Sequence, residues 1–98
     1  MRVPPGAPTV GLMKEYLVEI YAARTDARRA TDGAESARAA AEELTRRGIH
    51  ARYCRSIFVP TDETCFVLFE AESLEVAYDL ARLANLPAER VSAVVTHT

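Results

Sequence analysis

Residues 50–70 read HARYCRSIFVPTDETCFVLFE, and this stretch decides the fold. Two runs rich in β-branched and aromatic residues, 50–59 and 64–70, flank the polar tetrapeptide PTDE at 60–63. Side chains of these kinds favour strands, and a short polar segment with proline favours a turn. The stretch therefore predicts two antiparallel strands joined by a hairpin loop.

Upstream of the hairpin, the sequence predicts one strand and one helix. The run KEYLVEIY at 14–21 alternates in the manner of a strand. A capping box that begins at Asp32 marks one start for the helix. Asp26 marks an earlier start, which places Gly33 inside the helix at a cost of about 1 kcal/mol. Gly48 is expected just after the helix ends.

Downstream of the hairpin, the sequence predicts a second helix and a last strand. Ser73 is a favourable N-cap residue and precedes an apolar stripe over 74–84. The run at 90–96 is strand-like. The resulting order, β-α-β-β-α-β, is the split βαβ pattern of ferredoxin-like folds. Right-handed crossovers place both helices on one face of a four-stranded antiparallel sheet, so the expected class is α+β.

Length and composition indicate one small domain. The chain has 98 residues, of which 49% are hydrophobic and 27% charged, as is typical of a globular domain. Residues 1–12 are rich in proline and glycine and lack any periodic pattern. We expect them to form a flexible leader, followed by a single ferredoxin-like domain at 13–98.

Charge and hydropathy indicate neither nucleic-acid nor membrane binding. The net charge of −2 provides no basic footprint for nucleic acid. The longest apolar stretches have the length of strands, too short to span a bilayer, and no signal peptide is recognisable before Lys14. We therefore expect a cytoplasmic protein in which Cys54 and Cys65 are reduced thiols.

The predicted strands are apolar on both faces. The runs CFVLF at 65–69 and IFV at 57–59 leave no polar face, although two helices cover only one face of such a sheet. An exposed apolar patch of that size is uncommon in a monomer. We expect a homodimer that packs through the open sheet face, as in dimeric α/β-barrel proteins. The alternative is that residues 1–12 fold back over this face.

Glu19 is a lone carboxylate in an otherwise apolar strand. A buried carboxylate needs a partner or a function. The expected partner is Arg55, or Arg52 if the faces run the other way. Two interpretations stay open: an ion pair that orders the sheet or the dimer, and a polar group that lines a ligand pocket. Tyr21 and Tyr53 are the aromatic residues expected at the rim of such a pocket.

Cys54 and Cys65 lie on opposite strands of the predicted hairpin. A loop at 60–63 places Cys54 opposite Phe69, on the same face as Cys65 and about 13 Å along the ladder from it. That separation excludes a disulfide within one chain. Two interpretations stay open: small buried hydrophobic residues, and metal ligands that meet across a dimer.

His50 and His97 complete the set of candidate ligands for nickel or zinc. No HxxH, HxH or CxxC spacing joins the histidines and cysteines of this chain. Solvated histidines at a strand edge and at the chain end are the other interpretation. The primary expectation is a protein without a bound cofactor.

Three segments, 53–71, 16–19 and 85–91, read YCRSIFVPTDETCFVLFEA, YLVE and NLPAERV. Together they resemble small bacterial proteins of a domain-of-unknown-function family that includes a nickel-binding protein. The resemblance spans residues 14–96. It implies a ferredoxin-like dimer and raises a bound divalent metal such as nickel.

The residues of the family's metal site are only partly present. Members of the family tend to have a histidine before the serine of the second strand, where this chain has Arg55. They often have a cysteine or histidine in the third strand, where this chain has Val67, whereas Glu19 matches. A permanent cation removes a ligand and repels a metal ion. The comparison implies that an Arg55–Glu19 pair replaces the nickel site.

Three function classes follow in order of preference. The first is a small dimeric binding protein of unknown ligand, with a pocket near Glu19 and Arg55. The alternative is a divalent-metal binding protein that uses the cysteines and histidines across the dimer. The third, by analogy with other sheet-paired dimers, is a cofactor-free enzyme. No GxGxxG, P-loop, GxSxG, HExxH or EF-hand motif is present, so we assign no catalytic residue.

Overall fold

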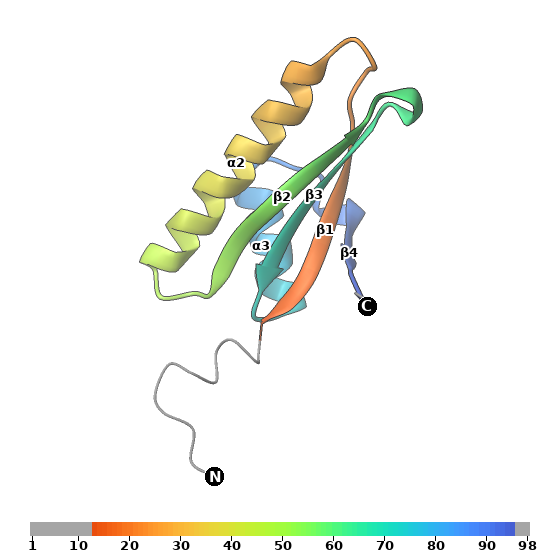
Figure 1. The fold of residues 1–98 in the computed structure, drawn as a ribbon. Coiled ribbons are helices and arrows are strands. Elements are labelled where there is room, and N and C mark those ends of the chain that lie inside the picture. Colours follow the sequence, from red (N-terminus) through yellow and green to blue (C-terminus); the bar gives the residue numbers. More distant parts are fainter. Residues whose placement is uncertain (1–12, 96–98) are drawn as a thin grey trace.

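The computed structural model describes residues 13–95, which form a four-stranded antiparallel sheet with two helices on one face (Figure 1). The elements are β1 (Lys14–Tyr21), α2 (Ala27–Arg46), β2 (Ala51–Val59), η1 (Pro60–Asp62), β3 (Thr64–Ala71), α3 (Leu74–Leu83), η2 (Ala88–Arg90) and β4 (Val91–Ala93), where η denotes a 3₁₀ turn. The strand order β2-β3-β1-β4 confirms the expected ferredoxin-like α+β fold. Within residues 13–95, neither helix is long and apolar enough to cross a membrane.

Helix α2 takes the earlier of its two predicted starts. Asp26 is the N-cap, and its Oδ1 accepts a hydrogen bond from the backbone N–H of Arg29 at 3.2 Å. Asp32 lies within the helix and does not cap it. A Cβ at Gly33 would lie 2.9 Å from Cδ1 of Ile20. Glycine therefore lets α2 approach β1 closely, which offsets its poor helix propensity.

A β-bulge interrupts the hairpin register away from the loop. Near the loop, the pairing of β2 with β3 is as expected. Tyr53, rather than Cys54, pairs with Phe69, because Cys54 is inserted as an extra residue before Arg55. The expectation that Cys54 lies opposite Phe69 is therefore wrong. The expectation that Cys54 and Cys65 share a face of the sheet is wrong for the same reason. One extra residue reverses the alternation of every side chain beyond it.

The inner face of the sheet, which the helices cover, holds the hydrophobic core. Its strand residues include Tyr16, Val18, Ile20, Cys65, Val67 and Phe69, all of them buried. The helices contact this face through small and branched residues: Ala37, Ala40, Ala41, Leu44, Ala77, Leu80 and Ala81. The rings of Tyr16 and Phe69 stack with centroids 6.2 Å apart. The small helical residues keep the two layers close together.

The outer face of the sheet, opposite the helices, carries no further layer in the described part of the chain (Figure 1). By strand alternation it presents the apolar side chains Leu17, Ile57, Phe66 and Leu68. Ile57 is 42% exposed. The leader expected at residues 1–12 lies outside the described residues, and so does the alternative in which it covers this face.

Strand β4 is shorter than the strand expected at 90–96. It begins after η2 and spans three residues, and residues 96–98 lie outside the described part of the chain. β4 pairs only with the segment Tyr16–Val18 of β1. Among the described residues, the last positions of β1 therefore have no strand beside them on that side. This end of the sheet is open toward the link between α3 and β4.

Candidate functional site

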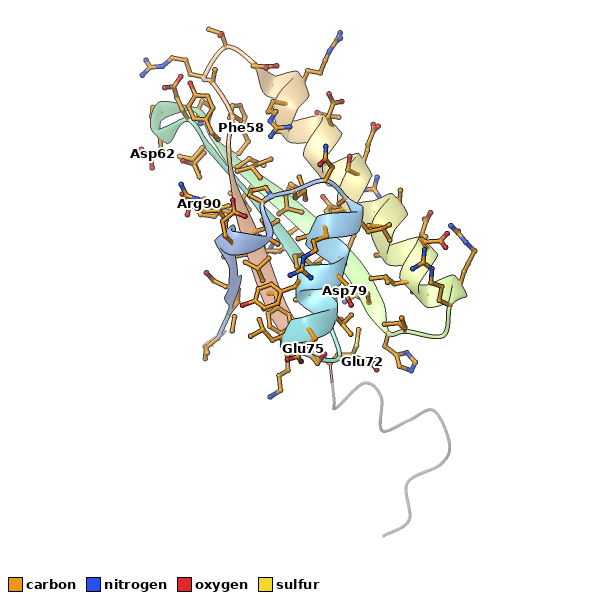
Figure 2. The ribbon with its side chains drawn as sticks, turned by 180° about the vertical axis from the view of Figure 1, so that it is seen from behind. Phe58, Asp62, Glu72, Glu75, Asp79 and Arg90 are labelled. Carbon is orange, nitrogen blue, oxygen red and sulfur yellow. The ribbon has the colours of Figure 1, made fainter. Side chains whose placement is uncertain are left out.

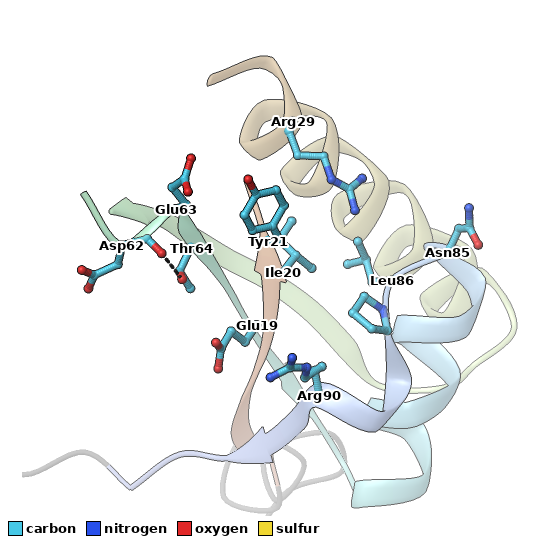
Figure 3. Close-up of a pocket in the computed structure, with 11 residues that line it drawn as sticks. Glu19, Ile20, Tyr21, Arg29, Asp62, Glu63, Thr64, Asn85, Leu86 and Arg90 are labelled. Carbon is cyan, nitrogen blue, oxygen red and sulfur yellow. Dashed lines mark hydrogen bonds between the residues drawn. The ribbon is translucent and has the colours of Figure 1, made fainter. Parts of the chain in front are cut away.

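A pocket of about 600 Å³ lies where β1 ends (Figure 3). Four segments line it: the end of β1, the first turns of α2, the β2–β3 hairpin and the link from α3 to β4. The lining residues are Glu19, Ile20, Tyr21, Arg29, Asp62, Glu63, Thr64, Asn85, Leu86, Pro87 and Arg90. We call this site the end pocket. Figure 2 shows Asp62 and Arg90 on one side of the molecule, away from Glu72 and Glu75 at its opposite end.

The link after α3 turns back toward β1 through a left-handed residue. Asn85 has φ 59°, a conformation that asparagine tolerates better than most residues. The backbone N–H of Leu86 donates a hydrogen bond to the carbonyl of Ala81 at 2.8 Å, and the Leu86 side chain is buried. The chain then passes through Pro87 into η2, which ends at Arg90. This path forms the wall of the end pocket that faces β1.

The hairpin tip is tied to the chain that leaves β1. Glu63 has φ 50°, and its carbonyl accepts a hydrogen bond from the N–H of Ala22 at 3.0 Å. Its side-chain Oε2 accepts another from the N–H of Arg24 at 3.0 Å. The Thr64 hydroxyl donates to the carbonyl of Asp62 at 2.9 Å. These bonds hold two carboxylate side chains at the hairpin side of the end pocket.

None of the five charged side chains of the end pocket has an ion-pair partner among residues 13–95. Asp62 and Glu63 come from the hairpin, Glu19 from β1, Arg29 from α2 and Arg90 from η2. Glu19 is partly buried, and both arginines are exposed. Guanidinium and carboxylate groups form their strongest hydrogen bonds with groups of opposite charge. The pocket therefore offers charged groups that the fold itself does not use.

Two of the four predicted ligand-binding residues, Glu19 and Tyr21, meet in the end pocket. Arg55 lies elsewhere, exposed on the outer face. Strand β3 separates it from Glu19, because Glu19 pairs with Phe66 and Arg55 with Leu68. The expected Arg55–Glu19 ion pair is therefore not formed within the chain. Glu19 is also less buried than expected, since it points to the outer face.

Tyr53, the fourth predicted ligand-binding residue, lies in a separate pocket between α2 and β2. The guanidinium of Arg38 lies 4.8 Å from the centroid of its ring. Its hydroxyl is 3.0 Å from Oγ of Ser56. Arg52, the other expected partner of Glu19, instead pairs with Glu70 at 2.9 Å across the hairpin. These contacts satisfy Tyr53 and Arg52 without any ligand.

The candidate metal ligands lie apart from one another. His50 is exposed at the start of β2, Cys54 is partly exposed at the bulge, and Cys65 is buried in the core. His97 lies outside the described residues. Burial raises the pKa of both thiols, which keeps them protonated at neutral pH. Within residues 13–95, no three His, Cys, Asp or Glu side chains are grouped so as to hold a metal ion.

Sequence reasoning did not single out the two arginines of the end pocket. Arg29 was missed because neither predicted start of α2 shows that the first turns of the helix lie beside the end of β1. Arg90 was missed because the pattern at 90–96 predicts a strand and not a turn beside β1. The topology does contain a usable signal, since in the βαββαβ order these four segments meet at one end of the sheet.

The end pocket is lined by charged and apolar side chains together. Its lining combines three carboxylates, two guanidiniums and the apolar side chains of Ile20, Leu86 and Pro87, and among the described residues it includes no cysteine, histidine or serine. No protein-family model, curated protein or solved structure matches this chain. The geometry of the pocket and of the outer face is therefore the guide to function.

Proposed function

We propose that this protein binds a small polar ligand in the end pocket and acts as a homodimer through its outer sheet face. The observation that carries the proposal is the set of charged side chains, Glu19, Arg29 and Arg90, which converge on one pocket without ion-pair partners among the described residues. Ligand sites use precisely placed polar groups to fix the orientation of what they bind. The pocket volume of about 600 Å³ suits a small molecule.

Binding accounts for this lining better than catalysis does. Covalent catalysis needs a nucleophile beside a base, and both cysteines of the chain lie away from the pocket. The Thr64 hydroxyl donates its proton to a backbone carbonyl, and Glu63 accepts a backbone N–H. The proposal assigns the remaining charges to ligand recognition.

The outer face supports the homodimer. Leu17, Ile57 and Phe66 lie on it, and no helix of the described chain covers them. In a two-fold symmetric interface, the same surface patch of each protomer packs against its copy on the other protomer.

The proposal also places the protein in the cytoplasm. Cys54 and Cys65 are free thiols, and the fold holds them on different faces of the sheet. Unpaired cysteines of this kind persist in a reducing compartment. Neither thiol is needed for the proposed ligand site.

Ligand binding is tested by a screen of small polar molecules, with nickel and zinc included, monitored by amide chemical shifts in NMR spectra of the full chain. We expect binding that shifts the amides of Tyr21 and Arg90 and is lost in Glu19→Gln and Arg90→Gln. The control is Arg47→Gln, which removes a surface ion pair with Glu43 far from the pocket. Binding that survives both pocket variants, or no binding at all, contradicts the proposal. Nickel binding that is lost in Cys54→Ser would favour a metal protein instead.

The dimer is tested by light scattering during gel filtration. We expect twice the chain mass for the wild type and a monomer for Ile57→Glu. The control is Leu83→Glu, because Leu83 lies on α3 and is 44% exposed, close to the 42% of Ile57. The two variants add the same charge at equally exposed sites. A monomeric wild type, or equal disruption by both variants, contradicts the dimer through the outer face.

A further inference from the structure

We infer that the ligand of the end pocket is a small zwitterion, a molecule that carries one carboxylate and one ammonium group. This inference rests on the proposed ligand-binding function and adds the chemical class of the ligand. It depends on how the charges of the pocket are distributed, which Figure 3 displays.

The two kinds of charge occupy opposite walls. Asp62 and Glu63, on the hairpin, and Glu19, on the outer side of β1, form an acidic wall (Figure 3). Arg29, on α2, and Arg90, on η2, form a basic wall on the helix side (Figure 3). The two walls form no ion pair with each other within the described residues. A gap between opposite charges suits a ligand that bridges them.

The basic wall recognises an anionic group. Arg29 and Arg90 reach the pocket from two different elements and lie at the two ends of the basic wall, so each end offers a guanidinium to an anionic group. A guanidinium presents its donors in a fixed fork that matches a carboxylate. The N-cap bond of Asp26 to the N–H of Arg29 keeps that residue within the helix. The helix start therefore fixes the backbone position of Arg29.

The acidic wall and the open edge of β1 recognise an ammonium group. Glu19 offers carboxylate oxygens, Glu63 already uses one oxygen on the N–H of Arg24, and the Asp62 carboxylate points outward from the hairpin (Figure 3). The N–H of Val94 donates to the carbonyl of Glu15, so every second residue of β1 counted from Glu15 directs its backbone N–H and carbonyl toward the β4 side. Tyr21 is one of these residues, and it lies beyond the end of β4, where no strand pairs with it. Its carbonyl is a further acceptor for an ammonium group.

An apolar floor lies between the walls. Ile20 and Leu86 are buried and line the pocket together with Pro87. A surface of this kind contacts the carbon skeleton that joins the two charged groups of the ligand. It also lowers the local dielectric constant, which strengthens the charge interactions on both sides.

Ligands with a single charge fit less well. Three carboxylates and two guanidiniums line the pocket, so a simple anion meets a net negative field. A simple amine leaves both arginines without a partner. A zwitterion satisfies both walls and leaves the net charge of the pocket unchanged, so each half of the ligand contributes without opposing the other.

The test compares matched ligands by calorimetry on the full chain. The zwitterions are glycine, 4-aminobutanoate and 6-aminohexanoate, each set beside the carboxylate and the amine of the same carbon skeleton. We expect at least one zwitterion to bind about tenfold more tightly than both of its single-charge analogues. In Arg90→Gln, the zwitterion should bind no more tightly than the matching amine. In Glu19→Gln, the zwitterion should bind no more tightly than the matching carboxylate. Arg47→Gln should retain both preferences.

The outcomes separate this inference from the proposed function. If the carboxylates bind as tightly as the zwitterions, the acidic wall takes no part and the inference is wrong, although the pocket still binds a ligand. The inference also fails if no zwitterion binds while another molecule from the screen does so through Glu19 and Arg90. If no molecule of either set binds, both proposals fall. Circular dichroism of each variant verifies that a lost affinity is not a lost fold.

Discussion

Replacing Asp26 by alanine tests both the start of α2 and the wall of the end pocket that this start creates. The carboxylate Oδ1 of Asp26 accepts the N–H of Arg29 at 3.2 Å, which satisfies one of the unpaired donors at the helix start. Asp32→Ala is the matched control, because Asp32 is exposed inside the helix and caps nothing.

The magnitude follows from two contributions. Loss of an N-cap side chain costs about 1 kcal/mol, and loss of a negative charge near the helix start costs about 0.5 kcal/mol more. We therefore expect Asp26→Ala to lower the free energy of unfolding by about 1.5 kcal/mol. A urea dependence of about 1.5 kcal/mol per molar converts this to a midpoint lower by about 1 M. Asp32→Ala should leave stability unchanged or raise it by up to about 0.5 kcal/mol, since alanine has the better helix propensity.

The assay is urea unfolding followed by circular dichroism, at one protein concentration for all variants because dimerisation stabilises the folded state. The end pocket provides a second readout. When the first turn of α2 frays, Arg29 loses its fixed position, so ligand affinity should fall in Asp26→Ala and not in Asp32→Ala. A larger loss of stability in Asp32→Ala would refute the reasoning, because the helix would then begin at Asp32 and Arg29 would lie outside it.

Three further predictions concern a turn, the two thiols and a surface ion pair. Gly48 has φ 82°, and no atom lies within 4 Å of the position that a Cβ would occupy there, so Gly48→Ala should cost about 1 kcal/mol from backbone strain alone, as measured by urea unfolding; an unchanged midpoint would contradict this. Burial raises the pKa of Cys54 and Cys65, so iodoacetamide should modify Cys54 more slowly than an exposed peptide thiol and Cys65 only after unfolding. The rate at Cys54 should keep rising with pH after that of the peptide has levelled off, and mass spectrometry that finds Cys65 modified first would show the core to be wrong. Arg46 and Arg47 lower the pKa of Glu43 from its ordinary value of 4.5. The stability from this pair is present above that value and is lost as the pH falls through the lower folded pKa, so Glu43→Gln should lose less stability between about pH 5 and pH 3 than the wild type; equal losses would mean that the ion pair contributes nothing.

The hairpin and the second helix were predictable because local chemistry specifies them. The tetrapeptide at 60–63 forms the turn that its proline and polar residues indicate. Ser73 caps α3 as expected, its Oγ accepting the N–H of Val76 at 3.2 Å. Asn85 adopts the left-handed conformation that asparagine tolerates at a helix end. Each of these features involves residues only a few positions apart.

The bulge at Cys54 was not predictable from the run of residues around it. Strand periodicity assigns faces by counting from the loop, and an inserted residue leaves no mark in composition. Pairing with β3 fixes the insertion, because Tyr53 packs on the inner face opposite Phe69 while Arg55 lies on the outer face opposite Leu68. The expected placement of Cys54 failed for this reason.

The candidate site was found in part. Glu19 stood out as a carboxylate in an apolar strand, and it does line the end pocket together with Tyr21. Its partners there, Arg29 and Arg90, come from distant segments that sequence periodicity does not connect. The shortness of β4 leaves the end of β1 open, and that length depends on how η2 packs against β1.

The sequence by itself determined the order of the elements, the ferredoxin-like class and the turn between β2 and β3. It also singled out Glu19 as a candidate site residue. These depend on short-range steric and hydrogen-bonding preferences, which act within a few residues. Only the tertiary structure decided the start of α2, the face of Cys54 and the composition of the end pocket. Those features depend on contacts between segments far apart in the chain, such as Gly33 against Ile20, and the free energy of such contacts outweighs the local preferences of either segment.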